Sequence, residues 1–104
     1  MQAETQTLNV RLTWSDVVTS EGRELVAPLP ITFGRANDNT IALNSNKVSR
    51  RHAVLRSQDG QVMLEDLQST NGTFVNGRRI AEMVLSDDDR VTIGGAELVV
   101  RLEG

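Results

Sequence analysis

The chain has 104 residues, no cysteine and a formal net charge of -3 at pH 7. This length suits one domain with a single core, and the lack of cysteine excludes disulfides, thiolate metal sites and cysteine nucleophiles. The acidic balance argues against nucleic acid as the main partner, because phosphate backbones attract broad basic surfaces. No apolar run approaches the ~20 residues that cross a bilayer, so no direct membrane insertion is predicted. The N-terminus is polar and unlike a signal peptide, and a cytoplasmic location is expected.

Short strands fill most of the chain. Residues 8–14 alternate between apolar and polar side chains, which is the period of a half-buried strand. Residues 1–6 have no such period and predict a flexible tail, so the domain is expected to span residues 7–104. No segment keeps apolar residues at three- and four-residue spacing, and no substantial helix is predicted. Runs rich in Val, Ile and Leu predict further strands at residues 24–29, 31–33, 40–43, 52–56, 62–66, 73–75, 91–93 and 97–102.

Turn-forming dipeptides separate several of these strands. Asp59-Gly60, Asn71-Gly72 and Asn76-Gly77 favour the positive φ angles of tight hairpin turns. Short strands at such regular spacing are typical of a β-sandwich or a barrel, and a sandwich suits a chain of this length. The sequence therefore predicts an all-β fold with two packed sheets.

Positive charge is concentrated in one region of this acidic chain. Between residues 34 and 56 there are five cations and one acid. The six residues 47–52 read Lys-Val-Ser-Arg-Arg-His and include the only histidine. A compact cationic region on an acidic protein indicates a site for a small anionic group. The five cations are Arg35, Lys47, Arg50, Arg51 and Arg56, and the acid is Asp38.

Several motifs at strand ends and in loops follow one another in a specific order. They are Phe33-Gly34-Arg35, Asn39, Ile41, Ser49-Arg50-Arg51-His52, Asp66, Ser69-Thr70-Asn71-Gly72-Thr73, Asn76-Gly77, Asp89 and Ile93-Gly94. Over residues 31–102 the chain resembles the forkhead-associated (FHA) domain, a phosphothreonine-binding β-sandwich. The resemblance implies about eleven mainly antiparallel strands in two sheets. It also implies that loops at one end bind a phosphothreonine peptide and prefer threonine to serine.

The residue types suit a phosphate ligand on physical grounds as well. A phosphate monoester carries roughly -1.5 to -2 charges and three acceptor oxygens, so a selective pocket needs charged donors from several directions. Arg35 supplies a planar fork that matches phosphate better than lysine does. Ser49 can add a hydroxyl donor, and loop amides can add more. By the resemblance, Arg50 lies beside the phosphate.

The resemblance also assigns residues to the bound peptide. Thr70 would contact the phosphate region, and Asn71 would fix the peptide backbone, a task that suits a side-chain amide with both donors and an acceptor. A basic residue near Lys47 favours an acid three residues after the phosphothreonine in the family. We therefore expect a preference for Asp or Glu at that place. The expected partners are a phosphothreonine-containing protein or peptide and an upstream Ser/Thr kinase.

Three further residues of the motifs are expected to shape the loops and not to contact the ligand. Gly34 and Gly72 serve backbone geometry. His52 could act as a base, but the family pattern makes it a structural residue that braces the loops by hydrogen bonds.

No cofactor is expected. No metal site is expected either, because Asp87-Asp88-Asp89 lacks the glycine and the later acid of a calcium loop.

Two alternatives remain open at this stage. One is a small hydrolase with Ser49, His52 and Asp66, although no nucleophile elbow or oxyanion-hole motif accompanies them. The other is a scaffold that binds partners independently of phosphate.

The N-terminal tail carries two threonines, Thr5 and Thr7, beside Glu4. Phosphorylation of either threonine could let the tail occupy the domain's own pocket.

Overall fold

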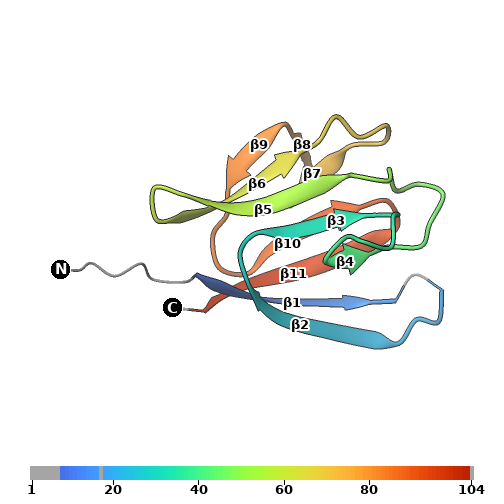
Figure 1. The fold of residues 1–104 in the computed structure, drawn as a ribbon, viewed down its shortest axis with the longest axis horizontal. Coiled ribbons are helices and arrows are strands. Elements are labelled where there is room, and N and C mark those ends of the chain that lie inside the picture. Colours follow the sequence, from blue (N-terminus) through green and yellow to red (C-terminus); the bar gives the residue numbers. More distant parts are fainter. Residues whose placement is uncertain (1–7, 17, 104) are drawn as a thin grey trace.

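The computed structural model describes residues 8–16 and 18–103, and in these residues it has eleven strands and no helix (Figure 1). The predicted all-β sandwich is therefore confirmed. The predicted tail, with Thr5 and Thr7, lies outside the described residues. The strands are β1 Asn9–Ser15, β2 Gly22–Pro28, β3 Ile31–Gly34, β4 Ile41–Ala42, β5 Ala53–Gln58, β6 Gln61–Asp66, β7 Thr73–Val75, β8 Arg78–Ile80, β9 Glu82–Val84, β10 Asp89–Ile93 and β11 Ala96–Glu103.

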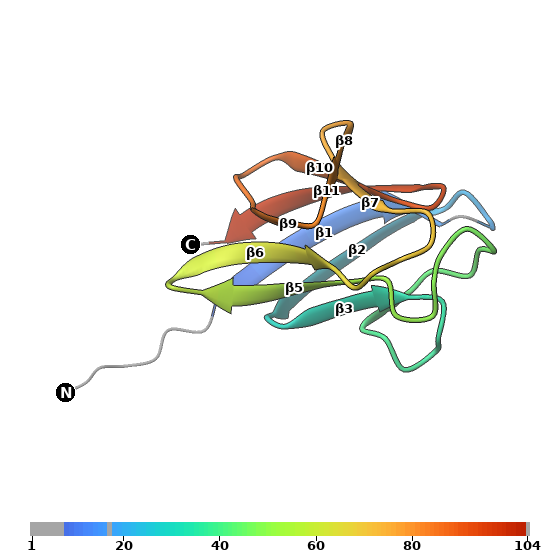
Figure 2. The same ribbon diagram turned by 90° about the horizontal axis from the view of Figure 1, so that it is seen from above.

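Two sheets form the sandwich. One has six strands in the order β2-β1-β11-β10-β7-β8, and the other has five in the order β4-β3-β5-β6-β9. All the pairs are antiparallel except β3 with β4, which run parallel. The loops after β3, β4 and β6 gather at one end, and the β5–β6 turn lies at the opposite end (Figure 2). Among residues 8–16 and 18–103, no helix is long and apolar enough to cross a membrane.

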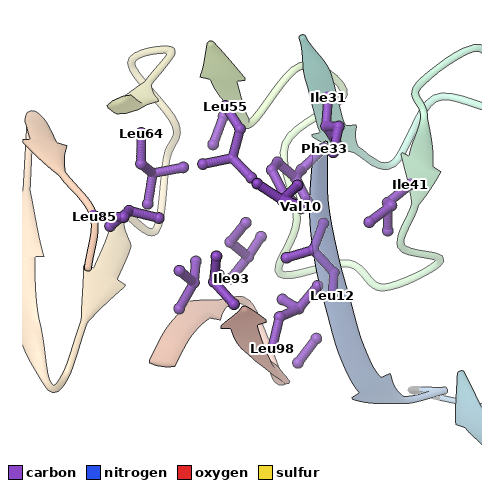
Figure 3. Close-up of a cluster of buried hydrophobic side chains, with 14 of the residues drawn as sticks. Val10, Leu12, Ile31, Phe33, Ile41, Leu55, Leu64, Leu85, Ile93 and Leu98 are labelled. Carbon is purple, nitrogen blue, oxygen red and sulfur yellow. The ribbon is translucent and has the colours of Figure 1, made fainter. Parts of the chain in front are cut away.

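The core lies between the two sheets. Figure 3 shows Phe33, Leu55 and Leu64 of the five-stranded sheet facing Leu12 and Leu98 of the six-stranded sheet. All five of these side chains are 1% exposed or less. Burial of each such side chain stabilises the fold by about 1.5–3 kcal/mol. Strands β3, β5 and β6 are thus anchored in the core, and the loops that follow β3 and β6 start from fixed points.

The apolar patterns of the sequence did not predict two strands, β8 and β9. All three residues of β9 are exposed, and β8 begins with two exposed arginines, so neither strand shows alternation. Both lie at sheet edges, where only one neighbour and little burial are needed. The short strand predicted at residues 40–43 is shorter still in the structure, where β4 has two residues.

The turn dipeptides divide into two kinds. Asp59-Gly60 and Asn76-Gly77 have positive φ at both residues and join paired antiparallel strands, as predicted. The prediction of a tight hairpin at Asn71-Gly72 is wrong. Strands β6 and β7 belong to different sheets, and of these two residues only Gly72 has a positive φ. This loop crosses the end of the sandwich instead of turning back on one sheet.

Candidate functional site

Three loops surround a shallow depression at one end of the sandwich. They are the β3–β4 loop (residues 35–40), the β4–β5 loop (43–52) and the β6–β7 loop (67–72). The depression has a volume of about 390 Å³. Its lining includes five of the six residues expected to contact a peptide, and Lys47 lies in the adjoining depression that shares Asn46. The lining residues are Arg35, Asn46, Val48, Ser49, Arg50, Thr70 and Asn71.

Backbone hydrogen bonds join the first two loops. The Arg35 amide donates to the Ser49 carbonyl at 2.9 Å, and the Ala36 amide donates to the Arg50 carbonyl at 3.3 Å. The Asn39 Nδ2 group donates to the Ala36 and Arg50 carbonyls at 2.8 and 2.9 Å. Arg35 and Arg50 are therefore held on adjacent stretches of backbone. Asn39 belongs to the motifs of the sequence, but the motifs do not indicate that its side chain bridges the two loops.

Gly34 makes this close approach possible. A Cβ atom on Gly34 would lie 2.1 Å from the Arg50 carbonyl oxygen and 2.6 Å from Asn39 Nδ2. Any side chain would therefore push the β4–β5 loop away from β3. The glycine is required here by space, because the residue before Arg35 lies directly beneath the neighbouring loop.

His52 connects the β4–β5 loop to the β6–β7 loop. Its ring is fully buried, Nδ1 accepts from the Ser49 amide at 3.1 Å, and Nε2 lies 2.8 Å from the Gly72 carbonyl. An amide can only donate, so Nδ1 is the unprotonated nitrogen and Nε2 carries the proton. Both ring nitrogens are occupied by backbone groups, and the imidazole is not aligned as a base for the Ser49 hydroxyl.

The β6–β7 loop rests on a half-buried carboxylate. Asp66 Oδ1 accepts from the Ser69 hydroxyl at 2.5 Å and from the Thr73 hydroxyl at 2.7 Å. Its Oδ2 accepts from the Ser69 amide at 3.2 Å. The Ser69 oxygen in turn accepts from the Gly72 amide at 3.0 Å. Asp66 therefore supports the loop from below, which differs from the orienting role that a hydrolase would give it.

These contacts also set the charge state of Asp66. Partial burial acts to raise the pKa of Asp66, but hydrogen bonds from the Ser69 and Thr73 side chains and the Ser69 amide outweigh it. The net effect is a pKa below the ordinary value of 3.8. The carboxylate thus stays charged as the acceptor of this network near neutral pH.

Two polar side chains at the depression have hydrogen-bonding capacity beyond the bonds that they make within the chain. The Ser49 Oγ atom accepts from the Thr70 amide at 3.0 Å, so its own proton can donate into the depression. Asn71 Nδ2 donates to the Lys47 carbonyl at 2.9 Å. The other amide atom, Asn71 Oδ1, remains an acceptor. Each side chain is thus held by one hydrogen bond and keeps a further donor, in Ser49, or acceptor, in Asn71.

The cations at the depression differ in their pairing. Within residues 8–16 and 18–103, no carboxylate lies within ion-pair distance of Arg35, Lys47 or Arg50. Arg51 instead makes two bonds to Asp38, at 2.8 and 2.7 Å. These bonds lower the pKa of Asp38 and raise that of Arg51. Three exposed cations beside a polar depression therefore have no ion-pair partner in the described residues, an arrangement that suits an anion.

Other groups named from the sequence lie apart from the depression. Asn76 forms the β7–β8 turn, and its side chain bonds the Asp89 side chain and the Arg90 amide, both at 3.0 Å. Asp87 accepts from the Leu102 amide at 2.8 Å. In the part of the chain that the structure describes, no group of three His, Cys, Asp or Glu side chains could hold a metal ion.

Comparison with known proteins agrees with this architecture. The FHA domain family model matches residues 31–94. The FHA domain-containing protein FhaA of Mycobacterium tuberculosis is 46% identical over 71 residues, or 67% of this chain and 13% of FhaA. The ABC transporter ATP-binding/permease protein Rv1747 of the same organism is 46% identical over 72 residues, or 69% of this chain and 8% of that protein. The chain thus spans a small part of either relative.

A solved structure gives the same result for the fold. It comes from an analysis of phosphothreonine-dependent FHA domain interactions and is 33% identical to this chain, with a TM-score of 0.77. The match covers 92% of this chain and 98% of that one. Since the family model covers more than half of the residues and the sandwich and its loops agree with it, the chain belongs to the FHA domain family.

Proposed function

We propose that this chain is a non-catalytic domain that binds phosphothreonine peptides and so links a Ser/Thr kinase to the assembly of proteins. The observation that carries the proposal is the group of cations without an ion-pair partner, Arg35, Arg50 and Lys47, at a depression that also presents the Ser49 hydroxyl. The FHA structure from the analysis of phosphothreonine-dependent interactions supports the same ligand class. Phosphopeptide capture by arginine-bearing loops is a known recognition mode.

In this proposal the phosphate is bound by the loops that follow β3 and β4. Arg35 donates from its planar guanidinium to two phosphate oxygens, a geometry that lysine cannot offer. Ser49 donates its free proton to a third position, and Arg50 adds positive charge from the same side. Backbone bonds already hold the loop backbone at these residues, so the ordering that remains when the peptide arrives is that of the exposed arginine side chains.

The β6–β7 loop binds the peptide around the phosphothreonine. Asn71 Oδ1 accepts a hydrogen bond from a peptide N–H, and Thr70 contacts the phosphate region. Lys47 attracts an acid three residues after the phosphothreonine. A small space for the threonine methyl group gives threonine its advantage over serine.

The partners in this role are a phosphothreonine-bearing protein and the kinase that modifies it. The proposed location is the cytoplasm, where protein kinases have their ATP. The role requires no cofactor, no nucleic acid and no insertion into a membrane. Because the chain covers a small share of its relatives, the activity of any larger protein that contains such a domain is a separate question.

Calorimetric titration with an oriented phosphothreonine peptide library tests the proposal. Phosphothreonine peptides should bind, phosphoserine peptides should bind more weakly, and unphosphorylated peptides should not bind. Arg35→Ala should lose ~1.5–3 kcal/mol of binding free energy, as expected for a charged hydrogen-bonding contact. Arg51→Ala is the matched control, because Arg51 already pairs with Asp38.

The alternatives predict other outcomes. Equal binding with and without phosphate would replace the proposal by a phosphate-independent scaffold. Turnover of ester or phosphoester substrates that disappears in Ser49→Ala would reinstate the hydrolase. Unchanged phosphopeptide affinity in Arg35→Ala would remove Arg35 from the site.

A further inference from the structure

Arg79 lies close to the β6–β7 loop, although no motif pointed to it. In the β7–β8 hairpin Arg79 is directly opposite Phe74. Its Nε and Cζ atoms are 2.8 and 3.1 Å from the position that a Cβ on Gly72 would occupy, and Phe74 Cε1 is 3.2 Å from the same point. The guanidinium therefore lies against the backbone of Gly72. The preceding residue, Asn71, lines the depression.

Gly72 and Phe74 flank the Arg79 side chain in the structure. Residues directly opposite on antiparallel strands have neighbouring side chains, so Arg79 and Phe74 are neighbours on one face of the hairpin. Gly72 leaves room for the group only because it has no side chain. The Arg79 side chain is exposed, but these two neighbours limit the rotamers open to it, so it should lose less side-chain entropy on binding than an arginine without such neighbours.

The charge of Arg79 is also uncompensated. Its side chain is exposed, and no carboxylate in the described residues lies within ion-pair distance of it. Most arginines of the chain do have such partners. The paired arginines are Arg11, Arg23, Arg51, Arg56, Arg90 and Arg101. The arginines without an acidic partner are two at the depression, Arg35 and Arg50, and two in β8.

We propose that Arg79 binds an acidic side chain of the phosphopeptide where the peptide passes Asn71, and so adds a second anion to the motif that the domain reads. This inference rests on the proposed function. A carboxylate is the natural ligand, because the guanidinium offers it two parallel donors. Arg79 differs from Lys47, whose Cβ lies 3.4 Å from the Cβ position of Gly94, in the β10–β11 turn. The two cations therefore read the peptide from different elements.

The chain offers a matched control in Arg78. Arg78 is adjacent in β8 and has the same charge, and it is exposed. It pairs with Val75, whereas Arg79 pairs with Phe74, so the two arginines project from opposite faces of the strand. A general electrostatic effect would depend on both residues. A specific contact beside Gly72 would depend on Arg79 alone.

The experiment uses phosphothreonine peptides with one aspartate placed in turn at each of the flanking positions. For the unmodified chain, one position should strengthen binding by about threefold to fivefold, the range of a partly exposed ion pair. This gain should disappear in Arg79→Ala and Arg79→Gln and persist in Arg78→Ala. The measured quantity is the ratio of affinities for the aspartate and alanine peptides, which cancels a general loss of affinity, and thermal melts confirm that each variant is folded.

Three results would overturn the inference. They are no gain from aspartate at any position, a gain that survives both Arg79 substitutions, and a gain that falls equally in Arg78→Ala. Each of these leaves the proposed function intact if phosphothreonine binding persists. If the unmodified chain binds no phosphothreonine peptide, the proposed function and the inference both fail.

Discussion

The two sides of the depression differ in charge and in how they are supported. The first side, here called the cationic wall, comprises residues 35–52 and carries Arg35, Lys47 and Arg50. The second, here called the neutral wall, comprises residues 67–72 and presents Thr70 and Asn71. The cationic wall is supported by bonds between backbones, and the neutral wall by a carboxylate beneath it. Residues 35–52 thus supply the positive charge at the depression, and residues 67–72 supply an uncharged surface that Asp66 supports.

This division means that the two walls should respond differently to substitution. Substitutions that remove charge from the cationic wall should alter affinity and its dependence on salt, because they change the charge that faces the ligand. Changes beneath the neutral wall should alter stability and its dependence on pH, because the supporting group titrates. Four experiments test the division, in order of expected effect.

The largest effect should come from Gly34→Ala at the base of the cationic wall. The new methyl group would overlap the Arg50 carbonyl, and relief of the overlap should cost ~1–3 kcal/mol of unfolding free energy, as overpacking does. Peptide affinity should fall as well, because Arg35 and Arg50 move apart. Urea denaturation measures the stability. Gly22→Ala is the control, since a Cβ there meets nothing within 4 Å. A loss no larger than that of the control would contradict the close approach.

The second effect concerns Asp66, beneath the neutral wall. The pKa of Asp66 is lowered in the folded state, so its contribution to stability is complete above the ordinary value of 3.8 and is lost as the pH falls through the lower folded value. Asp66→Asn should cost ~1–2 kcal/mol near neutral pH, because it weakens charged hydrogen bonds. The difference from the unmodified chain should narrow in acid.

Urea denaturation at several pH values measures this difference. The control is Asp59→Asn in the exposed β5–β6 turn, where surface changes stay within about 0.5 kcal/mol. A cost for Asp66→Asn that stays constant down to strongly acidic pH would show that the charge of Asp66 is not what supports the loop.

The third effect concerns the contact between the walls at Ser49. Ser49→Ala removes the free donor and also leaves the Thr70 amide without its acceptor. Binding should weaken by about 1 kcal/mol, or roughly fivefold, as for loss of one hydrogen bond. Phosphopeptide titration measures it. Ser57→Ala, on the exposed part of β5, is the control, and an equal result for both variants would separate Ser49 from the ligand.

The smallest effect distinguishes two neighbouring arginines of the cationic wall. Arg50→Ala should weaken phosphopeptide binding about threefold and reduce its salt dependence, because Arg50 is an exposed charge at the depression. Arg51→Ala should have less effect, because its charge is already opposed by Asp38. Titration at two salt concentrations compares them. The reverse order would mean that the Asp38 pair opens when the peptide binds.

Sequence patterns predicted the strands that face the core and failed for those that do not. Alternation in β1 follows from burial of Val10 and Leu12, and the same physical cause produced the correct reading of the other core strands. Strand β9 buries none of its residues, so its sequence carries no such signal. Its position is set by pairing with β6, a long-range property that no local pattern contains.

Local sequence patterns also predicted only part of the site. Arg35, Ser49 and Asn71 stand in motifs, and the structure brings them to one depression. The motifs did not reveal that Asp66 supports the β6–β7 loop, because this depends on two hydroxyls converging on one oxygen. The motifs did not point to Arg79, although the sequence contains a turn that locates it. A two-residue hairpin at Asn76-Gly77 places the second residue after the turn opposite Phe74, and this register follows from the turn alone.

The single imidazole of the chain has a consequence for how the domain meets its ligand. The His52 ring spans the gap from the Ser49 amide to the Gly72 carbonyl, so the width of the gap follows from the covalent size of an aromatic ring. The ring is rigid, so this distance cannot lengthen or shorten while both hydrogen bonds are kept. The loop segments at Ser49 and Gly72 are therefore held at one separation, and under the proposed function we expect a peptide to dock onto a surface whose shape changes little on binding.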